Sequence, residues 1–125
     1  ISKFINQVLK LKDLSVFGNG NQIRSFCNVE DAARGLSLVL NKGKKNEIYN
    51  IGNNGEPITM LNLAKKIKKL SNSKVKIVKV DFENSDRSID REIFKRYPDL
   101  TKIKKHTGYK PNISLDDGIK KLLKK

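Results

Sequence analysis

The chain has 125 residues, a length that supports one domain with one hydrophobic core and leaves little room for two independent sites. Its formal net charge of +14 would suit a nucleic-acid ligand, but most of the 27 basic residues are lysines on expected helix faces, and Trp is absent. Specific nucleic-acid binding favours arginine and stacking aromatics. Solvated lysine faces are therefore the preferred interpretation, and a nucleic-acid or anionic-surface binding module is the alternative.

The composition also leads to expectations about the cellular compartment of the protein and about whether the sequence is a fragment. Residue 1 is Ile and the only methionine is Met60, so we expect a fragment or a processed piece of a longer protein. No apolar run is long enough to cross a bilayer, and the first residues lack a signal pattern. The single Cys27 fits a reducing compartment, and we expect a cytoplasmic protein.

The first expected elements are a helix and two extended pieces. Apolar side chains at helical spacing predict the end of a helix over residues 1–11. Alternation over residues 14–17 predicts a strand, and the Gly18-Asn-Gly20 run after it predicts a tight turn. Residues 23–26 form a second short extended piece.

A longer helix is expected to follow Asn28. Asn28 is its predicted cap, Glu30 and Asp31 lie in its first turn near the positive end of the dipole, and Gly43 is its predicted left-handed stop. We interpret Asp31 as a capping residue and not as a catalytic acid. The predicted buried stripe comprises Val29, Ala32, Ala33, Leu36, Val39 and Leu40.

The middle of the chain predicts two strands around another helix. Residues 48–51 form a nearly unbroken apolar run that ends at Gly52, as expected for a strand covered on both faces in a parallel sheet. Thr59 caps a helix with apolar side chains inward and lysines outward. Residues 75–80 alternate as a half-buried strand, and residues 81–98 are expected to be mostly loop.

The last part predicts two short helices, capped by Asp99 and Ser114 and separated by Gly108. Ser114 forms a capping box with Asp117. The fold class is therefore α/β, with helices packed on a few short strands in an incomplete sheet.

Residues for catalysis are missing from the sequence. Gly18 and Gly20 begin a Gly-x-Gly-x-x-Gly fingerprint, but Ile23 occupies the place of its third glycine. No tyrosine has a lysine four residues later. His106, on a lysine-rich helix, is interpreted as structural, and Cys27 as a small buried hydrophobic side chain. We predict no catalytic, cofactor-binding or metal-binding residue here.

The candidate binding residues are arginines. Arg24 follows the glycine turn and could hold its guanidinium toward a phosphate or carboxylate, which arginine binds bidentately. Arg87, Arg91 and Arg96 lie in the expected loop and could close over the same anion. Equally open is pairing of these arginines with the acidic side chains nearby, Glu83, Asp86, Asp90 and Glu92.

Four ordered blocks carry a family resemblance. Residues 18–31 read Gly-Asn-Gly-Asn-Gln-Ile-Arg-Ser-Phe-Cys-Asn-Val-Glu-Asp. They are followed by Ile-Tyr-Asn-Ile-Gly at 48–52, Arg-Tyr-Pro-Asp at 96–99, and Gly-Tyr-Lys-Pro at 108–111 with Leu-Asp-Asp-Gly at 115–118. Together they resemble the C-terminal portion of the extended short-chain dehydrogenases/reductases, that is, of NAD-dependent nucleotide-sugar epimerases, 4,6-dehydratases and decarboxylases.

The resemblance implies that two parts of the intact enzyme have different roles. An N-terminal Rossmann region, expected to be absent from residues 1–125, would hold NAD or NADP and a Tyr-x-x-x-Lys pair for transient oxidation at the sugar C4. Residues 1–125 would be a single C-terminal portion that binds the nucleoside-diphosphate sugar. Arg24 and Arg96 would contact the diphosphate, with Gln22 in the same pocket. The intact enzyme would be a homodimer, and this portion alone is expected to be inactive.

The match has departures that leave the substrate open. Asn28 replaces an aromatic residue, Asn19 an Asp, Thr107 a Leu, and Tyr109 a Trp. Epimerases, dehydratases and decarboxylases share the four blocks, so the resemblance does not choose among them. An inactive, truncated remnant is the remaining alternative.

Overall fold

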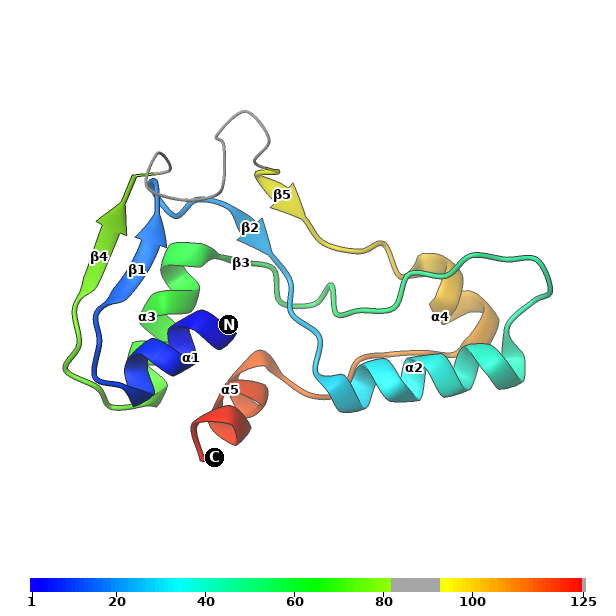
Figure 1. Ribbon diagram of the computed structural model, residues 1–125. Coiled ribbons are helices and arrows are strands. Elements are labelled where there is room, and N and C mark those ends of the chain that lie inside the picture. Colours follow the sequence, from blue (N-terminus) through cyan, green and yellow to red (C-terminus); the bar gives the residue numbers. More distant parts are fainter. Residues whose placement is uncertain (82–92, 125) are drawn as a thin grey trace.

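The computed structural model describes residues 1–81 and 93–124. Its elements in chain order are α1 (Ser2–Leu9), β1 (Leu14–Phe17), β2 (Ile23–Arg24), α2 (Val29–Lys42), β3 (Ile58–Thr59), α3 (Met60–Leu70), β4 (Ile77–Val80), β5 (Lys95–Arg96), α4 (Thr101–Thr107) and α5 (Leu115–Leu123). The molecule is elongated, with α1, α3, α5, β1 and β4 at one end and α2 and α4 at the other (Figure 1). The expected α/β class, with helices on a few short strands, is confirmed.

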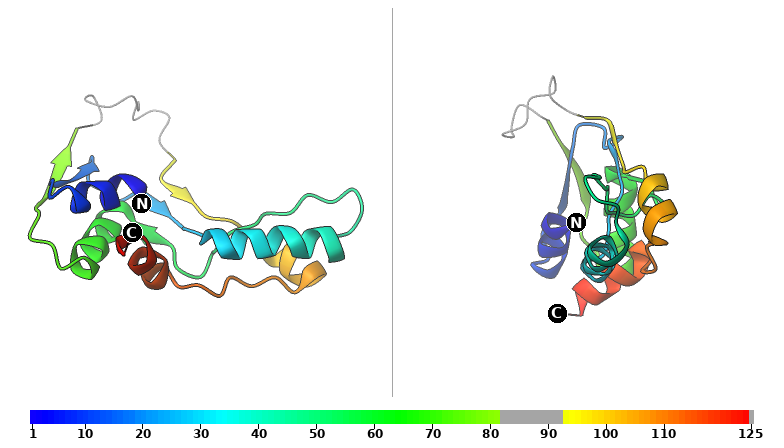
Figure 2. Two further views of the ribbon diagram at one scale, coloured as in Figure 1. Left: turned by 60° about the horizontal axis from the view of Figure 1, so that its bottom comes forward. Right: turned by 90° about the vertical axis from the view of Figure 1, so that its right-hand side faces the viewer.

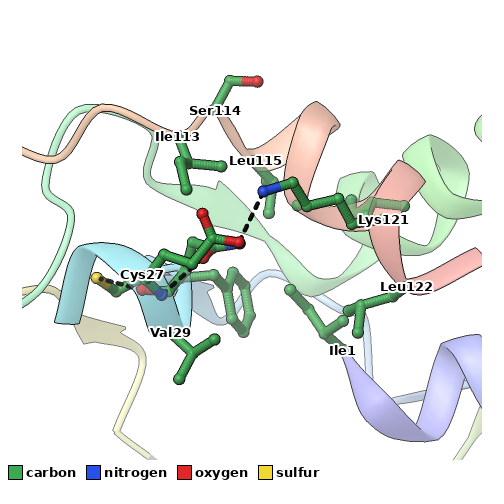
Figure 3. Close-up of a pocket in the computed structure, with 13 residues that line it drawn as sticks. Ile1, Cys27, Val29, Ile113, Ser114, Leu115, Lys121 and Leu122 are labelled. Carbon is green, nitrogen blue, oxygen red and sulfur yellow. Dashed lines mark hydrogen bonds and ion pairs between the residues drawn. The ribbon is translucent and has the colours of Figure 1, made fainter. Parts of the chain in front are cut away.

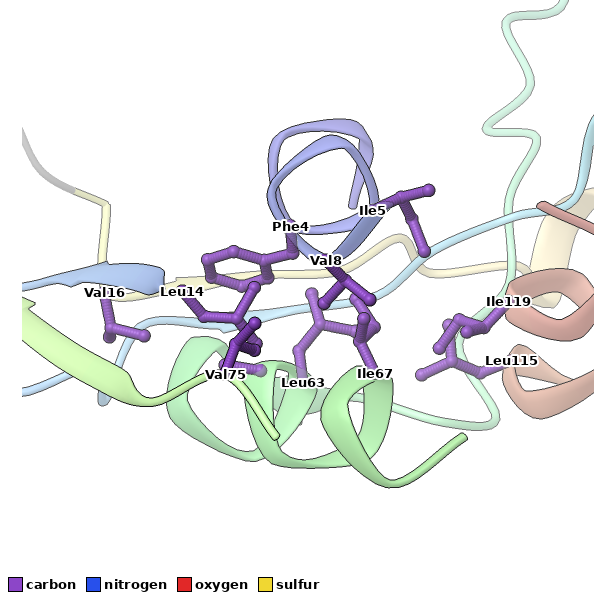
Figure 4. Close-up of a cluster of buried hydrophobic side chains, with 11 residues drawn as sticks. Phe4, Ile5, Val8, Leu14, Val16, Leu63, Ile67, Val75, Leu115 and Ile119 are labelled. Atoms are coloured by element: carbon purple, nitrogen blue, oxygen red, sulfur yellow. The ribbon is translucent and has the colours of Figure 1, made fainter. Parts of the chain in front are cut away.

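The larger core lies at the first end. β1 and β4 pair in parallel, with Leu14 opposite Ile77, and α1 and α3 pack against β1. Figure 4 shows side chains of α1 and α3 meeting between the two helices, with α5 closing one side. Its buried members are Phe4, Ile5, Val8, Leu14, Val16, Leu63, Ala64, Ile67, Val75, Leu115 and Ile119. This end therefore encloses an apolar interior built from several elements.

A second, three-stranded sheet lies beside this core. β2 is its central strand, antiparallel to β3 and parallel to β5. The chain reaches it through the turn after β1, where Gly18 and Gly20 have φ of 58° and 74°. A Cβ on Gly20 would lie 2.6 Å from Val16 Cγ1, so both the backbone conformation and the close packing require glycine there.

The second end has a smaller apolar cluster. Leu100, Ile103 and Tyr109 are its buried members, and Leu38, Val39, Tyr49 and Ile51 pack against them. α2 is close to α4. Gly35 permits the close approach of α2 to Ile51 and Tyr109, because a Cβ there would lie 2.7 Å from Ile51 Cγ2. In the side view of Figure 2, α1 and α4 lie on opposite sides of α2.

The predicted helix caps at three positions are confirmed. Asn28 accepts a hydrogen bond from Glu30 N, Thr59 from Asn62 N, and Ser114 from Asp117 N. Gly108 ends α4 in the left-handed conformation with φ of 73°. The predicted inward stripe of α3 is also confirmed, since Leu63, Ala64 and Ile67 are buried.

Three predictions about the other end are wrong. Gly43 ends α2 with φ of −64° in an extended conformation, and the left-handed residue beyond it is Asn46. Residues 48–51 form no strand, because no neighbouring strand pairs with them among the described residues. The stripe of α2 is misplaced: its buried residues are Asp31 and Gly35, whereas Leu40 is 87% exposed.

The segment expected to be mostly loop contains the short strand β5. β5 forms because the backbone at residues 95–96 finds a parallel partner in β2. Among the described residues, no helix has both the length and the run of apolar side chains needed to cross a lipid bilayer.

Candidate anion-binding site

Two of the three predicted binding residues lie on adjacent strands. Arg24 on β2 and Arg96 on β5 are direct partners in the parallel register. Neighbouring strands lie about 4.8 Å apart, and paired residues point to the same face. The fold therefore brings together two arginine residues that are far apart in the sequence.

Gln22, the third predicted residue, lies two positions before Arg24. Gln22 directly precedes β2, and its backbone carbonyl accepts a hydrogen bond from Met60 N at 3.0 Å. Gln22 is 4% exposed, whereas Arg24 is half-buried and Arg96 is exposed. The three positions therefore run from the interior to the surface.

The Arg24 side chain is held partly by its own strand. Its Nη1 donates a hydrogen bond to the Ile23 carbonyl at 2.9 Å. This bond occupies part of a guanidinium that has five N–H donors.

The other two predicted arginines, Arg87 and Arg91, lie outside the described residues. The same holds for their alternative acidic partners, Glu83, Asp86, Asp90 and Glu92. Their roles remain predictions. The candidate site consists of Gln22, Arg24 and Arg96.

A pocket of about 350 Å³ begins two residues after Arg24, at Phe26 (Figure 3). It lies between the start of α2, the N-terminal end of α1, and α5. Its walls are largely apolar, with an ion pair between Lys121 and Glu30 at 2.8 Å. The three predicted binding residues do not line it. Sequence patterns missed this pocket because its walls come from three separate segments.

Asp31 has a role other than the predicted cap. It is 2% exposed, and its carboxylate accepts hydrogen bonds from the backbone N–H groups of Asn112 and Ile113 at 2.9–3.0 Å. Arg34 Nη2 donates to it at 2.6 Å. Burial by itself would raise the pKa of Asp31, but these donors outweigh it and hold the pKa below its usual range. Asp31 thus fastens the segment before α5 to α2.

His106 and Cys27 take part in structural contacts. His106 Nδ1 lies 2.7 Å from the Tyr49 hydroxyl, and that hydroxyl accepts a hydrogen bond from Lys44 N. Cys27 Sγ lies 3.4 Å from the Asn28 carbonyl oxygen and 3.7 Å from the Tyr109 hydroxyl. Within residues 1–81 and 93–124, no three His, Cys, Asp or Glu side chains gather as a possible metal site.

Tyr109 is a buried member of the smaller cluster, and its hydroxyl lies near Cys27, a residue that lines the pocket. Its hydroxyl donates a 2.8 Å hydrogen bond to the Gly52 carbonyl, and burial together with the Cys27 contact raises its pKa. Tyr109 occupies the position at which the family that this sequence resembles has Trp. A large buried aromatic side chain is retained there.

The glycine turn does not form a dinucleotide site. After Gly20 the chain enters strand β2, whereas a pyrophosphate-binding fingerprint leads from a strand into the N-terminus of a helix. The described residues of this turn therefore do not fit NAD. They serve to position β2 and Arg24.

Comparison with known proteins agrees with the resemblance. Residues 1–52 match the model of the NAD dependent epimerase/dehydratase family. The chain is 36% identical over 123 residues to the UDP-N-acetyl-alpha-D-glucosaminuronate decarboxylase of Bacillus cytotoxicus, covering 98% of the chain and 38% of that relative. It is also 36% identical over 124 residues to UDP-glucuronic acid decarboxylase 4 of Arabidopsis thaliana, covering 99% of the chain and 26% of that relative.

Solved structures share the fold. The UDP-glucose 4-epimerase of Thermotoga maritima with UDP-glucose has a TM-score of 0.84 and 30% identity over 97% of this chain and 37% of its own. The UDP-glucuronic acid 4-epimerase of Bacillus cereus, with UDP-glucuronic acid and NAD, has a TM-score of 0.82 and 28% identity over 98% of this chain and 38% of its own.

The chain spans only about a third of the length of the proteins it matches. The similarity nevertheless extends over nearly all of its own length. On these findings the chain is similar to about a third of a nucleotide-sugar epimerase or decarboxylase, and its residues 1–52 match the NAD dependent epimerase/dehydratase family.

Proposed function

We propose that this chain is the nucleoside-diphosphate-binding part of an NAD- or NADP-dependent nucleotide-sugar epimerase, dehydratase or decarboxylase. The observation that carries the proposal is the register of Arg24 and Arg96 on adjacent parallel strands. Two guanidinium groups at this spacing match the two charged phosphates of a diphosphate. Gln22 supplies a neutral hydrogen-bonding group beside them.

The ligands of the solved relatives share this chemistry. The two epimerases were solved with UDP-glucose and with UDP-glucuronic acid, which have different sugars and the same nucleoside diphosphate. A site built around the diphosphate serves each of them. Binding energy on this non-reacting group would orient the sugar for chemistry elsewhere in the enzyme.

We assign the chemical step to a part of the enzyme outside residues 1–125. When bound there, NAD or NADP would supply transient oxidation at the sugar C4. This sequence has no Tyr-x-x-x-Lys pair, and its glycine turn leads into a strand. The chain alone should therefore bind the substrate's diphosphate and turn nothing over. We further propose that the whole enzyme is a cytoplasmic homodimer.

The test is UDP binding to a chimera in which this chain replaces the matching segment of the Bacillus cytotoxicus decarboxylase. Arg24→Ala should weaken UDP binding by about 1.5 to 3 kcal/mol, the range for a hydrogen bond to a charged group. Lys95→Ala, which removes a neighbouring exposed charge from β5, is the matched control and should change little. Unchanged UDP affinity in the Arg24 variant, measured by calorimetry, would refute the proposal.

A double-mutant cycle tests whether both arginines contact the same diphosphate. Arg24→Ala, Arg96→Ala and the double variant are compared by calorimetry with UDP and with uridine. A shared diphosphate predicts a coupling energy of about 0.5 kcal/mol or more with UDP and none with uridine. If the effects of the two substitutions on the free energy of UDP binding are strictly additive, Arg96 does not contact the diphosphate that Arg24 binds.

A further inference from the structure

The segments that follow α1 and α3 expose apolar side chains around a common cavity. Leu9 and Leu11 are 53% and 82% exposed, and both line a cavity of about 650 Å³. Leu70 at the end of α3 and the last residue of α5 line the same cavity. Figure 1 shows the chain leaving α1 and α3 at one corner of the molecule, away from β2 and β5. We call the walls of this cavity, together with Lys10 and Lys12, the helix-end surface.

Leu11 has a backbone conformation that leucine seldom adopts. α1 and α3 end with the same motif of two backbone hydrogen bonds, in which a left-handed residue follows the cap. After α1 these bonds run from Leu11 N and Lys12 N back to the last turn of the helix, at 3.0 and 2.8 Å. The left-handed residue is Asn72 after α3, with φ of 51°, and Leu11 after α1, with φ of 52°. Glycine and asparagine tolerate this conformation, whereas a leucine there costs free energy that its exposed side chain does not recover by packing within the described chain.

Lysines lie beside these apolar side chains. Lys10 and Lys12 alternate with Leu9 and Leu11 in the sequence, and Lys74 lines the cavity. The ion pairs between described residues involve none of these three lysines. The helix-end surface therefore has positive charge next to exposed apolar side chains.

The neighbouring chain is also cationic. Residues 65–76, which include the end of α3, contain six lysines and neither Asp nor Glu. Asp13 directly follows Lys12, and its Oδ1 accepts a hydrogen bond from Lys76 N at 2.8 Å. Lysines near the end of a helix oppose the negative end of its dipole, which explains the two lysines in the last turn of α3. That role does not explain the exposed leucines.

An anionic lipid bilayer fits both properties of this surface. Lysines close to a bilayer are attracted to acidic headgroups, and leucines beside them can enter the boundary between headgroups and acyl chains. A nucleic acid would gain affinity from the lysines alone and would leave the leucines in water. Composition by itself favours solvated lysine faces. The exposed leucines are the observation that changes this interpretation for one surface.

We propose that the helix-end surface binds a lipid bilayer that contains anionic phospholipids. The contact is peripheral and reversible. The two exposed leucines enter the headgroup boundary, and the lysines of the surface lie against the lipid phosphates. Arg24 and Arg96 lie on a separate sheet, and the proposal does not depend on them.

Sedimentation with lipid vesicles tests the proposal on the chain of 125 residues. Vesicles made of equal parts of phosphatidylglycerol and phosphatidylcholine should bind the chain about tenfold more tightly than vesicles of phosphatidylcholine alone, because the lysines have no anionic partner on a neutral bilayer. Binding should weaken as the salt concentration rises. Equal binding to both kinds of vesicle, or binding to neither, would overturn the proposal.

Leu11→Asn separates binding from folding. Asparagine suits the left-handed conformation, so the unfolding midpoint should stay the same or rise, whereas binding to the anionic vesicles should fall about tenfold. Leu40→Asn is the matched control, because Leu40 is 87% exposed on α2 and does not line the cavity. Equal losses of binding in the two variants, or a lower unfolding midpoint in Leu11→Asn, would contradict the assignment.

The double variant Lys10→Gln, Lys12→Gln tests the charges. Binding to the anionic vesicles should fall about tenfold or more, since each lysine near such a surface adds to the attraction. The matched control is Lys44→Gln with Lys45→Gln, which removes two exposed lysines after α2 and should change little. Equal losses would attribute binding to net charge and would overturn the proposal.

Other partners give different results. Binding of RNA that the double lysine variant abolishes and Leu11→Asn leaves intact, without binding to vesicles, would assign the surface to a nucleic acid. Concentration-dependent self-association that Leu11→Asn abolishes, again without binding to vesicles, would assign it to a second copy of the chain. Either result would overturn the proposal.

Discussion

The two ends of the molecule reach stability by different means. The end with α1, α3 and α5 encloses apolar side chains from several elements (Figure 4). The end with α2 and α4 buries only Leu100, Ile103 and Tyr109 as the core of its described cluster. It also depends on polar contacts, such as the hydrogen bond that the Asp31 carboxylate accepts from Ile113 N. The first end therefore encloses a core within the described chain, whereas the second leaves apolar side chains of α2, such as Leu36 and Leu40, exposed.

The largest expected effect is in the larger core. Ile67→Ala removes a fully buried side chain between α3 and its neighbours and should lower the free energy of unfolding by about 2 to 5 kcal/mol. Chemical denaturation measures it. Ile48→Ala, an equally large truncation at an exposed site of the other end, should cost far less. Comparable losses would show that the two ends are equally well packed.

Asp31→Asn should have the next largest effect. It replaces a charged acceptor of several hydrogen bonds by an amide with one oxygen, which should cost about 2 to 3 kcal/mol. Glu30→Gln is the matched control, because it removes the same charge one residue away from an exposed pair with Lys121. Denaturation of both variants gives the comparison, and equal losses would contradict the role of Asp31.

The same carboxylate makes the second end sensitive to acid. The pKa of Asp31 is lowered in the folded protein, whereas an unfolded Asp titrates near about 3.9. Its contribution is therefore present above that value and is lost as the pH falls through the lower folded pKa. The stability difference between wild type and Asp31→Asn should shrink as the pH falls below about 3.9 toward the lower folded pKa. A difference independent of pH would contradict this linkage.

Tyr109→Phe should have a smaller effect. It removes the buried hydrogen bond to the Gly52 carbonyl while keeping the ring, at a cost of about 1 to 2 kcal/mol. Tyr97→Phe removes an exposed hydroxyl and serves as the control. Hydrogen exchange should show the Tyr109 effect in α2 and α4 and little change in α3. A uniform effect would mean that the two ends unfold as one unit.

Leu40→Ser should have the smallest effect. Leu40 lies on the uncovered stripe, so its truncation should change the stability of the isolated chain by no more than about 0.5 kcal/mol. A loss above about 2 kcal/mol in the thermal or chemical midpoint would show that the stripe is covered within the chain itself.

Sequence reasoning succeeded where the determinants are local. The caps at Asn28, Thr59 and Ser114 bind backbone groups two or three residues away, so a short pattern contains all of the information. The inward stripe of α3 was also predictable, because its partners in α1 and β1 belong to the same chain.

The failures have a common physical origin. The α2 stripe and the strand at residues 48–51 were predicted from apolar patterns, and a pattern reports which side chains should be buried without supplying what buries them. A local pattern predicts only a cap at Asp31, because its bonds to Asn112 and Ile113 reach across about 81 residues of sequence. The resemblance pointed to Arg24 and Arg96, and only the strand register shows that they are neighbours.

The pairing of β2 with β5 also determines at which stage of folding the candidate site forms. Arg24 and Arg96 are separated by 72 positions (96 − 24), so their juxtaposition requires a long loop closure that carries an entropic cost. Contacts of such high sequence separation slow folding, and they form only after local helices such as α3. An anion that bridges the two strands would bind only chains that have completed this closure. Such a ligand would bind only the completed fold and would stabilise it by an amount that rises with the logarithm of the ligand concentration above its Kd.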